Sequence, residues 1–154
     1  MLRLNESTLL FLLGVLLVSA CKTPLKTTDV SLTGSYDRNT LQMSATGYGE
    51  TEEDAEMDAY RRALDAVMFR GFPQEGSSVR DPLIMDKAKA VANHEDFFDK
   101  LYSERLLEEF ILSSSSAGKQ KQGGQYESKQ NISFNLRLLR KRLQDEGIIR
   151  KFGI

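Results

Sequence analysis

The chain has 154 residues, with 21 Lys or Arg against 22 Asp or Glu, so its formal net charge is only −1. Such a balance provides no overall electrostatic field that would steer the protein to nucleic acid, and no nucleic-acid partner is expected. One cysteine cannot form an intrachain disulfide framework, and the length is that of a single domain of ordinary size.

The first twenty residues have the three parts of a secretory signal. A weakly basic start that contains Arg3 precedes an apolar run over residues 8–18. The run has about the length of an export core and is shorter than the ~20 residues that span a bilayer. It closes with residues 17–21 (Leu-Val-Ser-Ala-Cys), in which small residues stand directly before the only cysteine. The alternatives are an uncleaved anchor and a generic signal, with Cys21 an incidental thiol.

Residues 17–21 resemble the lipobox of bacterial lipoprotein signals. The resemblance implies that residues 1–20 are a signal peptide and that Cys21 carries acyl chains, which hold firmly when there are two or more. Lys22 stands where an inner-membrane retention signal typically has Asp, which implies the outer membrane of a double-membrane bacterium and leaves its side open. We expect residues 21–29 to be the lipidated cysteine with a flexible tether, and residues 30–154 to be one domain.

A hairpin is expected at the start of the domain. Residues 30–33 have an extended pattern, and residues 41–46 alternate apolar and polar side chains, as does a strand with one buried face. Turn-forming residues at 37–39 (Asp-Arg-Asn) lie between them. The glycines of Gly47-Tyr48-Gly49 then predict a break in the second strand.

The clearest helix is predicted between Thr51 and Gly71. Thr51 and Asp54 have the spacing of a capping box, and the acidic first turn suits the positive end of the helix dipole. Alanines at helical spacing form a stripe that lets a helix lie close to a sheet. The stripe consists of Ala55, Ala59, Ala63 and Ala66. Gly71 fits the C-terminal stop, and Pro73 prevents continuation.

Two further helices are predicted after a loop over residues 74–81. The first is short and covers residues 82–92. Asn93 and Asp96 indicate the start of the second, whose apolar positions recur at helical spacing as far as about Glu109.

Two long antiparallel strands joined by a polar tip are predicted between residues 110 and 134. Residues 113–124 have loop composition at their centre, whereas residues 126–134 alternate. Asn135 then caps a last helix with leucines on one face, and Gly147 ends it. This order of elements predicts an α+β fold, in which an antiparallel sheet of three to four strands has helices packed on one face.

Groups that could carry out chemistry are few. A phosphate loop at residues 47–49 is disfavoured, because the first helical turn is acidic and the third glycine and the lysine of such motifs are absent. His94, the only histidine, has no second histidine or free cysteine as a co-ligand, which leaves an all-carboxylate site or a solvated helix end. The serines of residues 113–116 have no identifiable base. We predict no catalytic residue, no metal site and no cofactor.

One local charge asymmetry remains, in the last helix. Arg137, Arg140 and Lys141 could contact anionic lipid headgroups or an acidic partner, and solvation of these side chains is the alternative. Tyr48 is free in the predicted turn to pack or to meet a partner. These four residues are the candidate partner or membrane surface.

Residues 45–49, followed by the alanine stripe, resemble a small bacterial outer-membrane lipoprotein family related to the N-terminal domain of the flagellar assembly protein T. In these proteins a strand with a glycine-rich end leads into an alanine-rich helix, and a later strand and helix close the domain. The resemblance implies a non-enzymatic envelope module with a protein partner. The expected function is therefore lipid-anchored binding or assembly in the cell envelope. A carboxylate-dependent enzyme, a small-molecule carrier and a purely structural lipoprotein are the alternatives.

Overall fold

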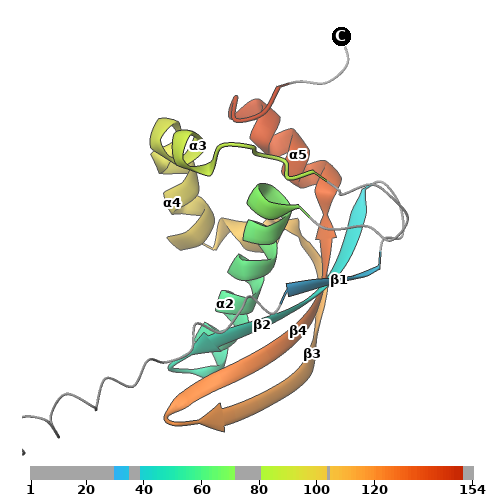
Figure 1. Ribbon diagram of the computed structural model, residues 1–154, viewed down its shortest axis with the longest axis vertical. Coiled ribbons are helices and arrows are strands. Elements are labelled where there is room, and N and C mark those ends of the chain that lie inside the picture. Colours follow the sequence, from blue (N-terminus) through green and yellow to red (C-terminus); the bar gives the residue numbers. More distant parts are fainter. Residues whose placement is uncertain (1–29, 35–38, 72–80, 104, 151–154) are drawn as a thin grey trace, which may run out of the picture.

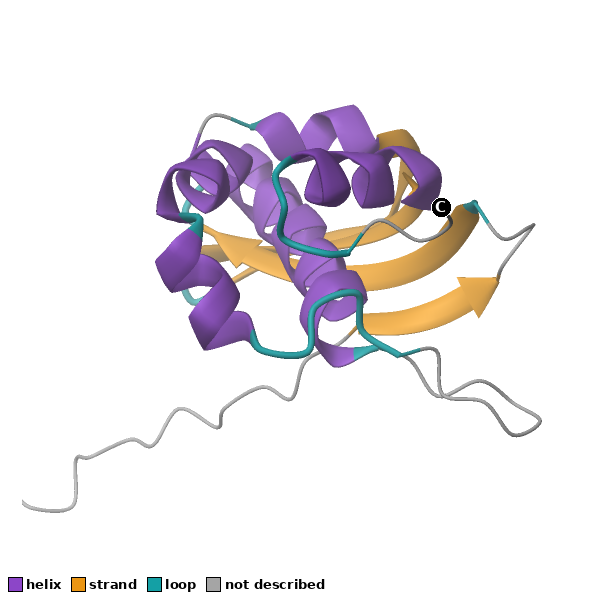
Figure 2. Ribbon diagram, turned by 90° about the horizontal axis from the view of Figure 1, so that it is seen from above, coloured by secondary structure: helices purple, strands orange, loops and turns teal. Residues whose placement is uncertain are grey.

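The computed structural model describes residues 30–34, 39–71, 81–103 and 105–150. The predicted signal, Cys21 and the tether lie outside these ranges, as do most of the predicted loop over residues 74–81 and Lys151. Within them the chain forms an antiparallel sheet with the strand order β1-β2-β4-β3. Figures 1 and 2 show the helices together on one side of this sheet. The predicted α+β fold with helices on one face is confirmed.

The four strands form two hairpin-like pairs that meet at the centre of the sheet. They are β1 (Val30–Gly34), β2 (Thr40–Gly49), β3 (Ile111–Gln122) and β4 (Gln125–Asn135). The predicted antiparallel pairing of the first two strands is confirmed, with Val30 opposite Ala45. The second pair is also confirmed, but its polar tip is only Gly123-Gly124, and both glycines have a positive φ. Most of the segment with loop composition is strand, because its backbone bonds along β4.

The first and last predicted helices are confirmed, and the two helices between them are shorter than the sequence predicted. The helices are α2 (Glu52–Asp65) with a π-helical turn η2 (Ala66–Arg70), α3 (Lys87–Asn93), α4 (Glu95–Ser103), the 3-10 helix η3 (Leu106–Phe110) and α5 (Leu136–Asp145). The prediction of a helix from residue 82 is wrong, since Ile84 N–H donates to the carbonyl of Met68 and Asp86 caps α3. The predicted helix to Glu109 is interrupted at Arg105, whose φ is +61°.

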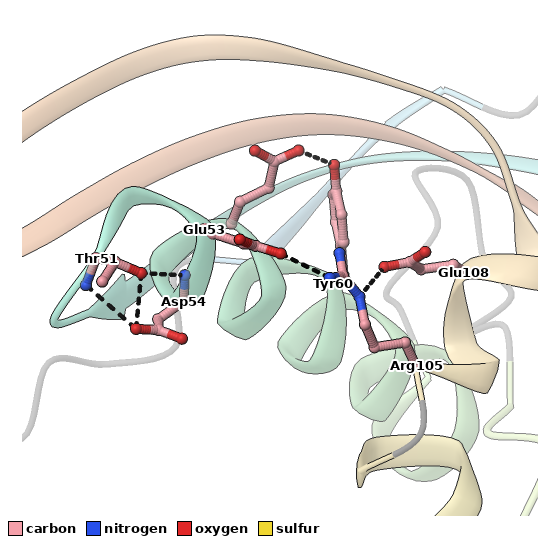
Figure 3. Close-up of polar contacts among 7 residues, drawn as sticks. Thr51, Glu53, Asp54, Tyr60, Arg105 and Glu108 are labelled. Atoms are coloured by element: carbon pink, nitrogen blue, oxygen red, sulfur yellow. Dashed lines mark hydrogen bonds and ion pairs between the residues drawn. The ribbon is translucent and has the colours of Figure 1, made fainter.

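Side chains cap two of these helices as predicted. The Asp54 N–H donates to Thr51 Oγ1 at 3.1 Å, and the Thr51 N–H donates to Asp54 Oδ2 at 3.2 Å, which completes the capping box (Figure 3). The Leu138 N–H donates to Asn135 Oδ1 at 3.0 Å, so Asn135 caps α5. Each cap satisfies backbone donors that the first helical turn leaves without a partner.

The glycines at 47 and 49 do not break β2, contrary to the sequence prediction. The strand continues to Gly49, opposite Tyr126 of β4. A Cβ at Gly47 would lie 2.2 Å from both the Ala55 carbonyl oxygen and the Ala59 nitrogen. A Cβ at Gly49 would lie 2.5 Å from the Ala55 nitrogen. The glycines are therefore needed because the backbone of α2 crosses directly over the strand.

The core lies between the sheet and α2, and α5 and α4 extend it. The alanine stripe is buried as predicted, with Ala55, Ala59 and Ala63 fully inaccessible to solvent. Larger side chains fill the space beside it. They include Leu41 and Met43 of β2, Ile132 and Phe134 of β4, Leu101 of α4, and Leu136, Leu139 and Leu143 of α5. Small residues thus set the helix-to-sheet distance, and leucine and phenylalanine provide most of the apolar burial.

Candidate binding surface

The face of the sheet opposite the helices is polar and open. Side chains alternate along a strand, so the buried residues Leu41, Met43 and Ala45 leave Gln42 and Ser44 on the other face of β2. A depression of about 540 Å³ crosses this face and has lining residues from all four strands. Its hydroxyl and amide lining comes from Thr33, Gln42, Ser113, Ser115, Asn131 and Ser133.

We call this depression the hydroxyl–amide face. Every polar side chain in its lining is uncharged and can both donate and accept hydrogen bonds. None of these described side chains titrates near neutral pH, so none of them could serve as a general acid or base. Its chemistry suits hydrogen bonding to a complementary polar surface.

Ser44 lies on this side of β2 and is buried, with 6% of its surface exposed. Among the residues that the structure describes, its Oγ has no hydrogen-bond partner. The buried Ser128 differs, because its Oγ accepts a hydrogen bond from Gln130 Nε2 at 2.7 Å. A buried polar group without a partner lowers stability, whereas removing one member of a bonded pair leaves the other unsatisfied.

We expect Ser44→Ala to leave the free energy of unfolding unchanged or to raise it by about 1 kcal/mol. The matched variant Ser128→Ala should lower it by about 1–3 kcal/mol, because Gln130 loses its acceptor. Urea denaturation measures both changes. Equal losses in the two variants would contradict the difference in hydrogen bonding.

Tyr48 lies on β2 and is held by α2. Its N–H donates to Asp58 Oδ2 at 2.9 Å, and the Arg62 guanidinium lies 5.4 Å from the centre of its ring. Arg62 Nε also pairs with Asp58 Oδ2 at 2.5 Å. In the described residues the pairing of β1 with β2 reaches Ala45, and Asp58 satisfies a backbone donor of β2 beyond that point. The contacts assign Tyr48 a role in fastening the helix to the strand.

The basic residues of α5 are partly neutralised by their own helix. Lys141 Nζ lies 2.5 Å from Asp145 Oδ2, and Arg142 Nε lies 3.6 Å from Glu146 Oε1. Both pairs have i,i+4 spacing, which contributes only a few tenths of a kcal/mol per pair on an exposed helix. The helix keeps an excess of positive charge, but its field is weaker than the sequence alone indicates.

The structure does not bring the candidate residues of the sequence together. Arg137 and Arg140 follow Asn135, which is opposite Thr40 at one end of β2. Tyr48 lies at the other end of that strand, eight residues away or roughly 26 Å at the rise of an extended strand. Tyr48 and the basic residues therefore belong to separate surfaces.

His94 connects two helices. Its N–H donates to the Ala90 carbonyl at 3.1 Å, and its carbonyl accepts from Phe97 and Phe98 at the start of α4. It also lines a hollow of about 610 Å³ beside Ile148 and Ile149. Among the residues that the structure describes, no group of three potential metal ligands occurs.

Two tyrosine hydroxyls have strongly shifted titration. Burial, reinforced by a hydrogen bond to Glu56, raises the pKa of Tyr60 to about 12, and the hydroxyl also bonds to Ser114 Oγ at 2.8 Å. Burial, reinforced by a hydrogen bond to Asp65, raises the pKa of Tyr102 further. Both stay protonated at neutral pH and cannot serve as bases. They join α2 to β3 and to α4.

Arg105 joins the segment after α4 to the start of α2. Its Nε lies 2.5 Å from Glu108 Oε1, and one of its terminal nitrogens lies 2.6 Å from Glu53 Oε1 (Figure 3). The carboxylates of Glu108 and Glu53 raise the pKa of Arg105. Its backbone is left-handed, a conformation that disfavours side chains larger than glycine. The two ion pairs thus accompany a strained backbone.

We expect Arg105→Ala to lower the melting temperature by about 3 °C, because it removes both ion pairs and keeps the strain. Arg105→Gly should lower it less, since glycine adopts a positive φ freely. Thermal unfolding followed by circular dichroism compares the two. A larger loss for the glycine variant would show that the strain is unimportant.

Comparison of the chain with models of protein families, with curated proteins and with solved structures finds no match. The site must therefore be interpreted from its own geometry. In the described ranges, no helix is both long enough and apolar enough to cross a lipid bilayer.

The hydroxyl–amide face could not be located from the sequence. Its residues are individually ordinary, and they come together only because β4 pairs with both β2 and β3. The serines of residues 113–116 have loop composition and no identifiable base in the sequence, and only the pairing of β3 with β4 places Ser113 and Ser115 on this face. The ion pair between Arg105 and Glu53 could not be predicted from a local sequence pattern, because the two residues lie far apart in the chain.

Proposed function

We propose that the chain is a bacterial lipoprotein that acyl chains on Cys21 anchor to the outer membrane, and that its domain is a non-enzymatic binding module for an envelope protein. The lipobox-like residues 17–21 support the anchor. The observation that carries the binding function is the hydroxyl–amide face. It spans all four strands, and no helix of the described part of the chain covers it.

The chemistry of this face favours a protein partner over a reaction. Hydroxyl and amide groups spread over four strands can bond to backbone and side-chain groups of a second polypeptide. The floor of the depression is the backbone of a hydrogen-bonded four-stranded sheet, which needs little ordering on binding. The proposed kinship with the lipoprotein family related to the flagellar assembly protein T rests on the strand and the alanine stripe quoted above, and an envelope protein partner is in keeping with it.

The anchor limits where such a partner can be. Val30 begins β1 nine residues after Cys21, a span of at most about 30 Å when fully extended. A module tethered in this way samples only a thin layer beside the membrane, which raises its effective concentration toward partners that share the layer.

Site-specific photocrosslinking in membranes tests the proposal. A photoreactive residue in place of Asn131, on the hydroxyl–amide face, should give a discrete adduct with another envelope protein. The matched control replaces Lys100, which is exposed on α4 on the helical side of the domain. Adducts at position 100 alone, or at neither position, would contradict this face as the binding surface.

A further inference from the structure

The strand β3 is a long, uncovered edge of the sheet. Its strand neighbour is β4 on one side, and the described part of the chain places no strand on the other. Every residue from Leu112 to Gln122 is exposed, and Figure 1 shows β3 as the outermost strand of the sheet. An edge of this kind presents a row of backbone donors and acceptors to any other extended chain.

The middle of this edge lacks the usual protection against strand pairing. Natural edges are blocked by charges, by proline, by bulges or by short length. β1, at the opposite edge, has only five residues. In β3 the register irregularities fall between Ile111 and Ser113 and between Ser116 and Gly118. They flank a regular stretch, Ser113–Ser116, that has neither charge nor proline.

We propose that two copies of the chain pair through β3, antiparallel about a two-fold axis near Ser115, and join their sheets into one. The inference does not depend on the proposed binding face, and its crosslinking test uses the lipidated form of the protein that the proposed function assumes. The two ends of β3 carry opposite charges. Glu108 is paired with Arg105 and Lys119 with Glu52 inside one copy, so the charges that can act between copies are those of Glu109 just before the strand and Lys121 near its end. Antiparallel pairing places the acidic end of one copy beside the basic end of the other.

An exposed leucine supports the same pairing. Leu112 is 55% exposed, which is unusual for a large apolar side chain in the described ranges. It precedes Ser115 by the same number of residues as Gly118 follows it. Both residues stand at the register irregularities of β3, so around an axis at Ser115 Leu112 of one copy lies near Ala117 and Gly118 of the second copy. The glycine leaves room for it, and pairing removes apolar surface from water.

A parallel arrangement of the two copies does not have these features. It would place like charges together at each end and would leave Leu112 beside its own equivalent. In an interface with two-fold symmetry both partners use the same patch. A dimer therefore covers both β3 edges and leaves neither edge open to a third copy. The charges at the two ends of β3 therefore favour a second copy of the chain as the partner of this edge.

Crosslinking of the full-length lipoprotein tests the axis directly. Residues directly opposite in an antiparallel pair have Cα atoms about 4.5–5.5 Å apart, which a disulfide can bridge. In detergent micelles in excess over protein, Ser115→Cys should give a covalent dimer on mild oxidation. Ser31→Cys, exposed on the opposite edge strand, should remain monomeric. Equal crosslinking of the two variants, or none at position 115, would overturn the proposal.

A charge exchange tests the orientation. Glu109 is exposed, and among the described residues the Lys121 ammonium contacts the ring and hydroxyl of Tyr126. Lys121→Glu should weaken dimerisation by about five- to tenfold, measured by sedimentation over a range of concentrations. The double variant Lys121→Glu with Glu109→Lys should restore it. Failure of the double variant to recover the dimer would exclude antiparallel pairing, and an unchanged dimer in the single variant would place the interface elsewhere.

Discussion

Gly47→Ala is expected to lower the free energy of unfolding by about 3 kcal/mol or more, at the upper end of the range for overpacking. The added Cβ would lie 2.2 Å from the Ala55 carbonyl oxygen and the Ala59 nitrogen. Both atoms belong to the backbone of α2, so no side-chain rotation can relieve the contact. Relief requires the helix to move away from β2, which opens the packing along the alanine stripe.

Gly118→Ala is the matched control. Gly118 also lies in a strand, but a Cβ there meets nothing within 4 Å, and its φ is not positive. This substitution should be neutral or should stabilise the fold slightly, because alanine reduces the freedom of the unfolded chain. Chemical denaturation of the two variants separates the close helix approach from the general effect of removing a glycine. Similar stabilities would show that α2 can shift at little cost.

The helix caps and the buried strand faces are the parts of the fold that the sequence could predict. The capping box at Thr51 and Asp54 and the cap at Asn135 depend on residues a few positions apart, and both are confirmed. The alternation of Leu41, Met43 and Ala45 with polar neighbours predicted a strand with one buried face, which is also confirmed. Local hydrogen bonds and periodic burial leave a direct pattern in the sequence.

The wrong predictions concern features that depend on distant residues. The glycines at 47 and 49 predict a local break in the strand, but the structure shows that they are needed because the backbone of α2 lies directly against them. The Ser113–Ser116 stretch has weak strand propensity, and it is a strand because β4 supplies the pairing. The hydroxyl–amide face depends on the same pairing. Strand order is thus the information that composition and periodicity did not contain.

Cys21→Ser is expected to move the protein from the membrane pellet to the soluble fraction almost completely. Each buried methylene contributes about 0.8 kcal/mol, and one chain binds only marginally, so stable anchoring by this route requires the acyl chains that a lipidated cysteine carries. Fractionation followed by mass spectrometry of the mature protein measures both location and modification. A mature N-terminus at a residue other than Cys21, or an unmodified Cys21 on protein that stays in the pellet, would contradict lipid anchoring.

Lys22→Asp separates the anchor from its destination. It leaves Cys21 in place, so the protein should remain lipidated and in the pellet. An aspartate directly after the lipidated cysteine resembles the inner-membrane retention signal, and the variant should therefore shift from the outer to the inner membrane on a density gradient. The first described strand starts at Val30, eight residues after the substitution, so the melting temperature of the domain should be unchanged. A variant that stays with the outer membrane would show that residue 22 does not determine the address, while leaving the anchor at Cys21 intact.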